Sequence, residues 1–169
     1  MIELMIVIAL MAILLAVAVP SFRDLIQRNR VAGEINSFVS DLQFARSEAI
    51  KRGQPVSLCP SANGSSCLGT NTWHQGWIVF FDANGSGTVG GGDTVLRVRA
   101  GWASGDTFVA NPSLTSLTYG RDGFAANLAA GTLTMPLRTS PVNNNATRCL
   151  TLNIVGRQTV QLPGVGSCT

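Results

Sequence analysis

A single acidic side chain stands near the start of an apolar segment. Glu3 is the only charged residue before Arg23, and residues 4–19 are an unbroken apolar run. A carboxylate in an apolar membrane segment costs about 2.5 to 3.5 kcal/mol on insertion scales, so it usually has a partner of opposite charge. An acidic residue is also favoured in the first turn of a helix, where the helix dipole is positive. Glu3 is therefore either an ion-pairing group or an ordinary first-turn residue.

Arginine supplies most of the positive charge. Eleven of the twelve cationic side chains are arginines, and after Thr94 six arginines stand against two aspartates, a difference of four. Guanidinium groups suit phosphate, which makes DNA a candidate partner, although one contact gives little affinity. The alternative is a set of ordinary solvated arginines on strands and turns. The candidate DNA-binding residues are Arg121, Arg138, Arg148 and Arg157, and the other two of the six are Arg97 and Arg99.

One glycine-rich segment has the outline of a calcium-binding loop. Oxygen-bearing side chains fall at positions 1, 3, 5 and 12 of a twelve-residue stretch, with glycine at position 6. The candidate ligands are Asp82, Asn84, Ser86 and Asp93. Against calcium, the last of these is shorter than the usual bidentate glutamate, and three glycines precede it. A turn between strands, stabilised by side-chain to backbone hydrogen bonds, accounts for the same residues.

Catalytic chemistry has little support in the sequence. His74 is the only histidine, it lies between Trp73 and Trp77, and no nucleophile elbow, metalloprotease motif or phosphate loop accompanies it. A histidine beside aromatic residues is typical of a packed strand end. We therefore predict that the chain is not an enzyme and needs no cofactor.

The four cysteines form a near pair and a later pair. They allow three disulfide pairings, and we favour Cys59 with Cys67 and Cys149 with Cys168, because each bond closes a short segment rich in glycine and serine. Disulfides fit a domain held outside the cytoplasm. A structural zinc site is the alternative, but the chain has no Cys-x-x-Cys spacing.

Two helical segments are expected at the N-terminus. Residues 1–22 are apolar and about as long as a membrane is thick, and a retained anchor is favoured over a cleaved signal because the early charge is negative. Residues 23–53 have apolar side chains at helical spacing, which predicts an amphipathic half that packs on the head. Gly53 should end the helix. Pro20 should kink or locally melt it, because proline lacks the amide hydrogen and clashes with the preceding turn.

Residues 54–169 have the texture of a β-rich head. Short apolar or alternating runs are separated by Gly, Asn, Ser and Pro, and no helical patterns alternate with them. The predicted class is α+β, with a long N-terminal helix packed on an antiparallel sheet or sandwich. We expect residues 76–81 and 94–99 to form a hairpin, and further strands at 107–110, 116–119, 132–135, 149–155 and 159–162.

Three stretches resemble a known family. Residues 2–10 look like the start of a mature type IV pilin, and Pro20 falls where pilins carry a helix-breaking proline. Residues 41–53 and 76–82 resemble the GspH/FimT family of minor pilins and pseudopilins. The resemblance implies a subunit of a bacterial filament, held in the inner membrane with its head in the periplasm before it enters a pilus or pseudopilus. It also implies that Glu3 pairs with the N-terminal amine of a neighbouring subunit.

The resemblance leaves three functions open. The first is a minor pilin near the tip of a type IV pilus that takes part in assembly, with other pilin subunits as partners. The second is a minor pseudopilin of type II secretion. The third is a DNA receptor for uptake of double-stranded DNA, since some FimT-like minor pilins use a Gly-Arg-x-Arg motif. Here residues 156–159 keep Gly156 and Arg157, but Thr159 replaces the second arginine.

The first residue departs from the pilin pattern. Mature pilins begin with Phe-Thr-Leu before the Ile-Glu pair, after a basic leader that ends in glycine, whereas here Met1 stands in the leucine position. We interpret this as a misplaced start codon or a trimmed chain. As written, the chain would not be processed and N-methylated by the prepilin peptidase.

Overall fold

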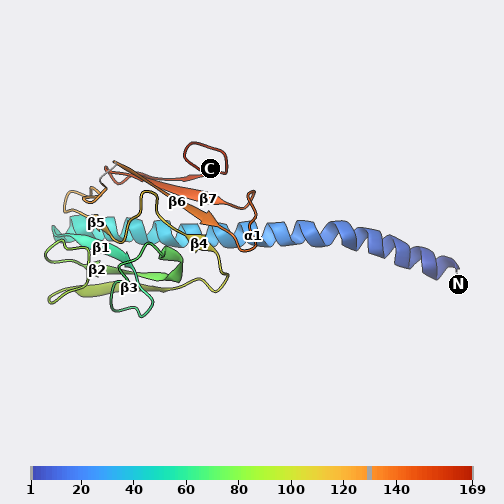
Figure 1. Ribbon diagram of the computed structural model, residues 1–169, viewed down its shortest axis with the longest axis horizontal. Coiled ribbons are helices and arrows are strands. Elements are labelled where there is room, and N and C mark those ends of the chain that lie inside the picture. The colour runs from blue at the N-terminus through green and yellow to red at the C-terminus, as the bar shows by residue number, and fades with distance from the viewer. Residues whose placement is uncertain (1, 129–130, 169) are drawn as a thin grey trace.

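One long helix and a compact β-rich head make up the structure. The computed structural model describes residues 2–128 and 131–168. Helix α1 (Ile2–Arg52) projects its N-terminal half away from the rest of the chain, while its C-terminal half lies against the head (Figure 1). The head begins directly after the helix, and the predicted α+β class is confirmed.

The end of α1 is fixed by a glycine. Gly53 has φ of +66°, and the amide of Gln54 donates to the carbonyl of Ala49 over 3.3 Å. This bond pairs one of the carbonyls that the last turn leaves free, in the manner of a Schellman motif. The predicted end of the helix is therefore confirmed.

Pro20 does not melt the helix. Residues on both sides of it remain helical, and α1 is gently curved along its projecting half (Figure 1). A proline inside a helix removes one intrahelical hydrogen bond and crowds the preceding turn, which costs about 3 kcal/mol. The helical hydrogen bonds on both sides of Pro20 keep the helix continuous, so the lost bond is accompanied by a bend and not by a break.

Eight strands form two four-stranded antiparallel sheets. The first sheet has the order β3-β2-β1-β5 and the second has the order β4-β6-β7-β8. A short 3₁₀ helix, η1 (Trp73–Gln75), leads directly into β2. The strands are β1 (Val56–Pro60), β2 (Gly76–Phe81), β3 (Thr94–Ala100), β4 (Thr107–Phe108), β5 (Leu117–Tyr119), β6 (Thr132–Arg138), β7 (Arg148–Asn153) and β8 (Gln158–Gln161).

The strands agree with the sequence in outline and differ in several bounds, since β6 runs three residues past the predicted 132–135 and β7 ends two residues before the predicted 155. The predicted hairpin of β2 and β3 is confirmed, with Trp77 opposite Arg99. β1 was not predicted as a strand, and it is buried on both faces, so its side chains do not alternate. β4 is shorter than the predicted strand at 107–110, because the side chain of Asn71 pairs with both the amide and the carbonyl of Ala110 in place of a neighbouring strand.

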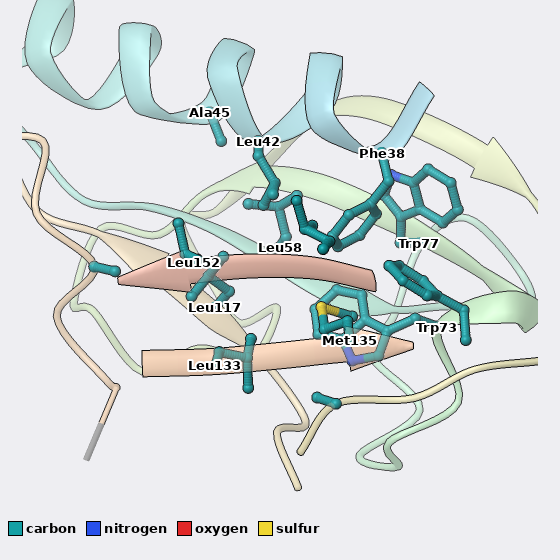
Figure 2. Close-up of a cluster of buried hydrophobic side chains, with 14 of the residues drawn as sticks. Phe38, Leu42, Ala45, Leu58, Trp73, Trp77, Leu117, Leu133, Met135 and Leu152 are labelled. Carbon is teal, nitrogen blue, oxygen red and sulfur yellow. The ribbon is translucent and has the colours of Figure 1, made fainter. Parts of the chain in front are cut away.

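The core lies where α1 meets both sheets. Side chains of the helix point at the inner faces of the strands (Figure 2). Phe38 is the centre of an aromatic cluster, with ring centroids 5.0 to 5.4 Å from Phe108, Trp77 and Trp73 in edge-to-face geometry. Such pairs contribute about 0.5 to 1.5 kcal/mol each beyond their buried area.

Both disulfides join near neighbours in sequence. Cys59 of β1 is bonded to Cys67 in the loop that follows, and Cys149 of β7 is bonded to Cys168 near the C-terminus. These are the pairs that the spacing favoured. Each bond ties a loop to a buried strand residue, since Cys59 and Cys149 are fully buried.

Candidate assembly helix and its anchor in the head

The N-terminal half of α1 is apolar and uncovered. It holds the one window, among the described residues, that is long and apolar enough to cross a membrane, and none of that window is buried within the chain. Leu4, Leu10 and Leu14 are each more than half exposed. Apolar surface of this extent is expected to be covered by a membrane or by other protein chains.

Glu3 lies in the first turn of this uncovered half. Its side chain is exposed, and it forms no ion pair with any residue in the described ranges 2–128 and 131–168. Glu3 is therefore placed either to pair with a group of another chain or to act as an ordinary first-turn residue.

Apolar packing of α1 on the head begins at Val31. Leu25 and Ile26 belong to the segment expected to pack on the head, yet they are 52% and 49% exposed. Their side chains extend the uncovered apolar surface past Pro20. The buried apolar residues of α1 are Val31, Ile35, Phe38, Leu42, Ala45 and Ala49.

A buried carboxylate anchors the docked half of α1. Asp41 is fully buried and accepts hydrogen bonds from Trp77 Nε1 at 3.0 Å, Arg97 Nη1 at 2.9 Å and Arg99 Nε at 2.8 Å. Arg97 also stacks over the ring of Phe44, with its guanidinium carbon 3.6 Å from the ring centroid. Helix α1 and the β2–β3 hairpin are therefore joined by one charged group and its three donors.

The protonation of Asp41 follows from these contacts. Burial alone would raise the pKa of this carboxyl, but the hydrogen bonds from Arg99, Arg97 and Trp77 together outweigh it and hold the pKa below its usual value. The carboxylate is charged at neutral pH. Both arginines are partly exposed, so the ion pair lies at the edge of the core.

The contact of Asp41 with Arg97 and Arg99 was not predicted from the sequence. Asp41 was counted with the polar residues of the helix, and the two arginines of β3 were counted with the basic surface. A signal was present, because Asp41 lies three residues after Phe38 and four before Ala45, on the same helical face. Arg97 and Arg99 are two apart on a strand, so they point to one face of the sheet.

The four candidate DNA-binding arginines fall into two pairs. Arg138 ends β6 and Arg148 begins β7, and the strands pair there. Arg157 lies in the turn between β7 and β8, at the other end of the sheet, roughly 20 Å away for a six-residue strand. Arg121 lies in the loop after β5, which meets that turn through the bond from the Ala125 amide to the Ile154 carbonyl. These residues do not form one continuous patch.

The glycine-rich segment after β2 is held by its own hydrogen bonds. Asp82 accepts from the amides of Ser86 and Gly87 and from Ser57 Oγ, and Asp93 accepts from the amides of Ala83 and Gly90. Asn84 Oδ1 also accepts from the Ser86 amide. The turn interpretation accounts for every one of the four candidate calcium ligands. Among the described residues, no group of three His, Cys, Asp or Glu side chains is placed to hold a metal ion.

His74 and its neighbours belong to the packing of the head. Trp73 and Trp77 are fully buried. His74 Nδ1 lies 3.3 Å from the amide nitrogen of Phe108, which donates to it in the tautomer with an unprotonated Nδ1. Trp73 and Trp77 join η1 and β2 to the aromatic cluster, and His74 joins η1 to the backbone of Phe108.

These features define an α+β protein in which one helix serves both as the core element of a disulfide-bonded head and as an uncovered apolar extension. The chain matches the family described as "Type II transport protein GspH" over residues 34–156, which is more than half of its length. It belongs to this family.

Solved structures share the fold. The type IV minor pilin FimU of Pseudomonas aeruginosa superposes with a TM-score of 0.63 at 21% identity, covering 79% of this chain and 90% of FimU. The minor pseudopilin EpsH from the type II secretion system of Vibrio cholerae superposes with a TM-score of 0.55 at 12% identity, covering 79% of this chain and 98% of EpsH. At these identities the likeness concerns the fold.

Proposed function

We propose that this chain is a minor subunit of a type IV pilus whose uncovered helix half packs among the helices of other subunits, near the tip, and helps to initiate assembly. The observation that carries the proposal is the contrast within α1, whose apolar window is wholly uncovered while its continuation from Val31 is buried. Leaving a Leu or Ile side chain in water costs about 1.5 to 3 kcal/mol relative to burying it, so the projecting half requires a covering of lipid or of neighbouring helices.

Before assembly, we propose that the same segment holds the chain in the bacterial inner membrane with its head in the periplasm. The uncovered window has the length and composition of a membrane span. Two disulfides in the head suit an oxidising compartment. The role is structural and not catalytic, in line with the structural proteins of its family.

Glu3 supplies the sharpest test. If it pairs with the N-terminal amine of a neighbouring subunit, Glu3→Ala in the precursor should reduce incorporation into sheared filaments, measured by immunoblot, at unchanged membrane levels. The matched control is Glu48→Ala, which removes a carboxylate from the other end of α1, where it pairs with Lys51 and Arg52. Equal incorporation of the Glu3 variant and the unmodified protein would refute the assembly role.

DNA uptake remains an alternative function. Arg121 and Arg157 lie at the same end of the head, beside the exposed side chains of Phe124, Ile154 and Val155, and this pair is the candidate contact with a phosphate backbone. A gel shift with the full chain in detergent at low salt tests it. Binding that Arg157→Ala weakens, with Arg148→Ala as the matched control, would favour this alternative. An absence of binding at tens of micromolar protein would remove it.

A pseudopilin role in type II secretion is the other alternative. The likeness to EpsH and the likeness to FimU concern the same fold, so they do not separate the two systems. The genes beside this one would separate them: minor pilin genes support the pilus, and secretion genes support the pseudopilus.

A further inference from the structure

An ionic cluster lies where α1 leaves the head. Arg30 and Glu34 are one helical turn apart, on either side of Val31, the first fully buried apolar residue of the helix. Asp106, in the loop between β3 and β4, is 1% exposed and faces them from the head. The cluster therefore joins the head to the first turn of α1 that buries an apolar side chain, while Asn143 of the head holds the turn before it through hydrogen bonds to Asp24 and Gln27.

Arg30 pairs with one of the two carboxylates in this cluster. Arg30 donates to both oxygens of Asp106, from Nε at 2.9 Å and from Nη2 at 2.8 Å, and the amide of Ser140 adds a third bond at 2.8 Å. Glu34 receives only the hydroxyl of Ser104, at 3.1 Å to Oε1. Its other oxygen, Oε2, is buried without a hydrogen-bond partner. A buried carboxylate oxygen in this position is costly when the group is charged.

The polar and charged groups around Glu34 come from the helix and from the head. Helix α1 contributes Arg30, and the β3–β4 loop contributes Asp106 and the Ser104 hydroxyl. In the second sheet, Arg138 lies opposite Thr107, the residue after Asp106, in the pairing of β4 with β6. Burial first, and then the negative charge of Asp106, raise the pKa of Glu34 from 4.5 to about 7, against the smaller opposing effects of Ser104 and Arg30.

A proton on Glu34 changes what this side chain does. The neutral acid donates a hydrogen bond, and Asp106 is near enough to accept it. The unpartnered oxygen then becomes a donor between helix and head. Without the proton, two negative carboxyl groups repel each other across the contact, and the guanidinium of Arg30 directs its hydrogen bonds to Asp106.

We propose that Arg30, Glu34 and Asp106 form a proton-dependent latch, which holds residues 30–35 of α1 against the head when Glu34 is protonated and loosens this turn when Glu34 is charged. The contacts of Phe38 and Asp41 do not involve the latch, and Asn143 continues to hold Asp24 and Gln27. The turn of α1 between these two attachments would therefore loosen as the pH around the head rises.

The direction of the pH effect follows from the raised pKa. The folded head binds the proton on Glu34 more tightly than the released helix turn does, so the latch is fully closed below about pH 4.5. It weakens as the pH rises towards and through about 7. By proton linkage, opening of this turn should become about tenfold more frequent between about pH 6 and about pH 8.

Hydrogen exchange of the full chain in detergent tests the latch. After correction for the intrinsic exchange rate, amides of residues 30–35 and 104–108 should lose about tenfold in protection over that pH interval, while residues 38–45 should not. Glu34→Gln keeps a neutral donor at the site, so its protection should no longer depend on pH. The matched control, Glu48→Gln, should behave like the unmodified protein.

Three results would overturn the proposal. They are an unchanged protection of residues 30–35 between the two pH values, the same pH dependence in Glu34→Gln as in the unmodified chain, and an equal effect of Glu48→Gln. If Glu34→Gln does not fold, carbon NMR of the unmodified chain decides, because the Glu34 carboxyl must titrate near neutrality, and titration near pH 4.5 contradicts the latch.

Discussion

The two halves of α1 differ in what covers them, although they belong to one continuous helix. The N-terminal half exposes an apolar surface on all sides, and the C-terminal half buries one stripe of side chains, from Val31 to Ala49, in its own head. A helix that is apolar all round is stable only inside other protein or lipid, whereas an amphipathic helix completes a core by itself. The head should therefore be stable without any contribution from the projecting half.

The largest effect should come from removing the cations around Asp41. The double variant Arg97→Ala, Arg99→Ala leaves a fully buried carboxylate with Trp77 as its one remaining side-chain donor. Breaking a buried ion pair on one side costs about 3 to 5 kcal/mol. Urea unfolding followed by tryptophan fluorescence measures it, because all three tryptophans lie in the head.

The control for that variant is Arg28→Ala. Arg28 forms an exposed ion pair with Asp24 on the helix surface, and such pairs contribute about 0 to 1 kcal/mol. If the double variant were no less stable than this control, Asp41 would not anchor the helix to the head.

A matched pair of leucines compares the two halves directly. Leu42→Ala opens a cavity in the core and should lower the free energy of unfolding by about 2 to 5 kcal/mol. Leu10→Ala removes the same atoms from the uncovered half, and should change the stability of the head by less than about 0.5 kcal/mol. The same urea unfolding of the full chain in detergent measures both. A similar loss in the two variants would mean that the projecting half contributes to the head after all.

The smallest effect concerns the end of the docked half. Gly53→Ala forces a side chain into a backbone with φ of +66°, although no neighbouring atom obstructs the new methyl group. The expected cost is about 1 to 2 kcal/mol of unfolding free energy, since only the backbone conformation is strained. Gly33→Ala is the matched control, because Gly33 lies inside the helix and, as at Gly53, no atom lies close to the added methyl group. This variant should be slightly more stable than the unmodified protein, since alanine favours the helix over glycine. A larger loss at Gly33 than at Gly53 would contradict this account of the helix end.

Local patterns in the sequence predicted the parts of the fold that depend on local chemistry. The end of α1 follows from Gly53, and the β2–β3 hairpin follows from its β-branched and aromatic residues and the polar turn between them. β1 escaped prediction because loops and the helix cover both of its faces, which removes the alternation that reveals a strand. The proline alone did not show that α1 would stay continuous and only curve gently in its projecting half, because this depends on the length of helix on both sides of Pro20.

The charged residues were harder to place, because charge alone does not show which atoms share a site. Asp41, Arg97 and Arg99 come from segments more than fifty residues apart and meet only through packing of the hairpin on α1. Glu34 and Asp106 are likewise brought together by the fold. In contrast, Arg121, Arg138, Arg148 and Arg157 follow one another in sequence and are separated by the length of the second sheet.

Site-specific photo-crosslinking in purified filaments tests the central claim most directly. A photoreactive residue at Leu10 should form adducts with the N-terminal helices of other subunits, whereas one at Leu42 should react only within its own head. Adducts at Leu10 that map to neighbouring helices would support the assignment of the uncovered half to the filament core. Filaments that contain the chain but yield no adduct with another subunit at Leu10 would contradict it.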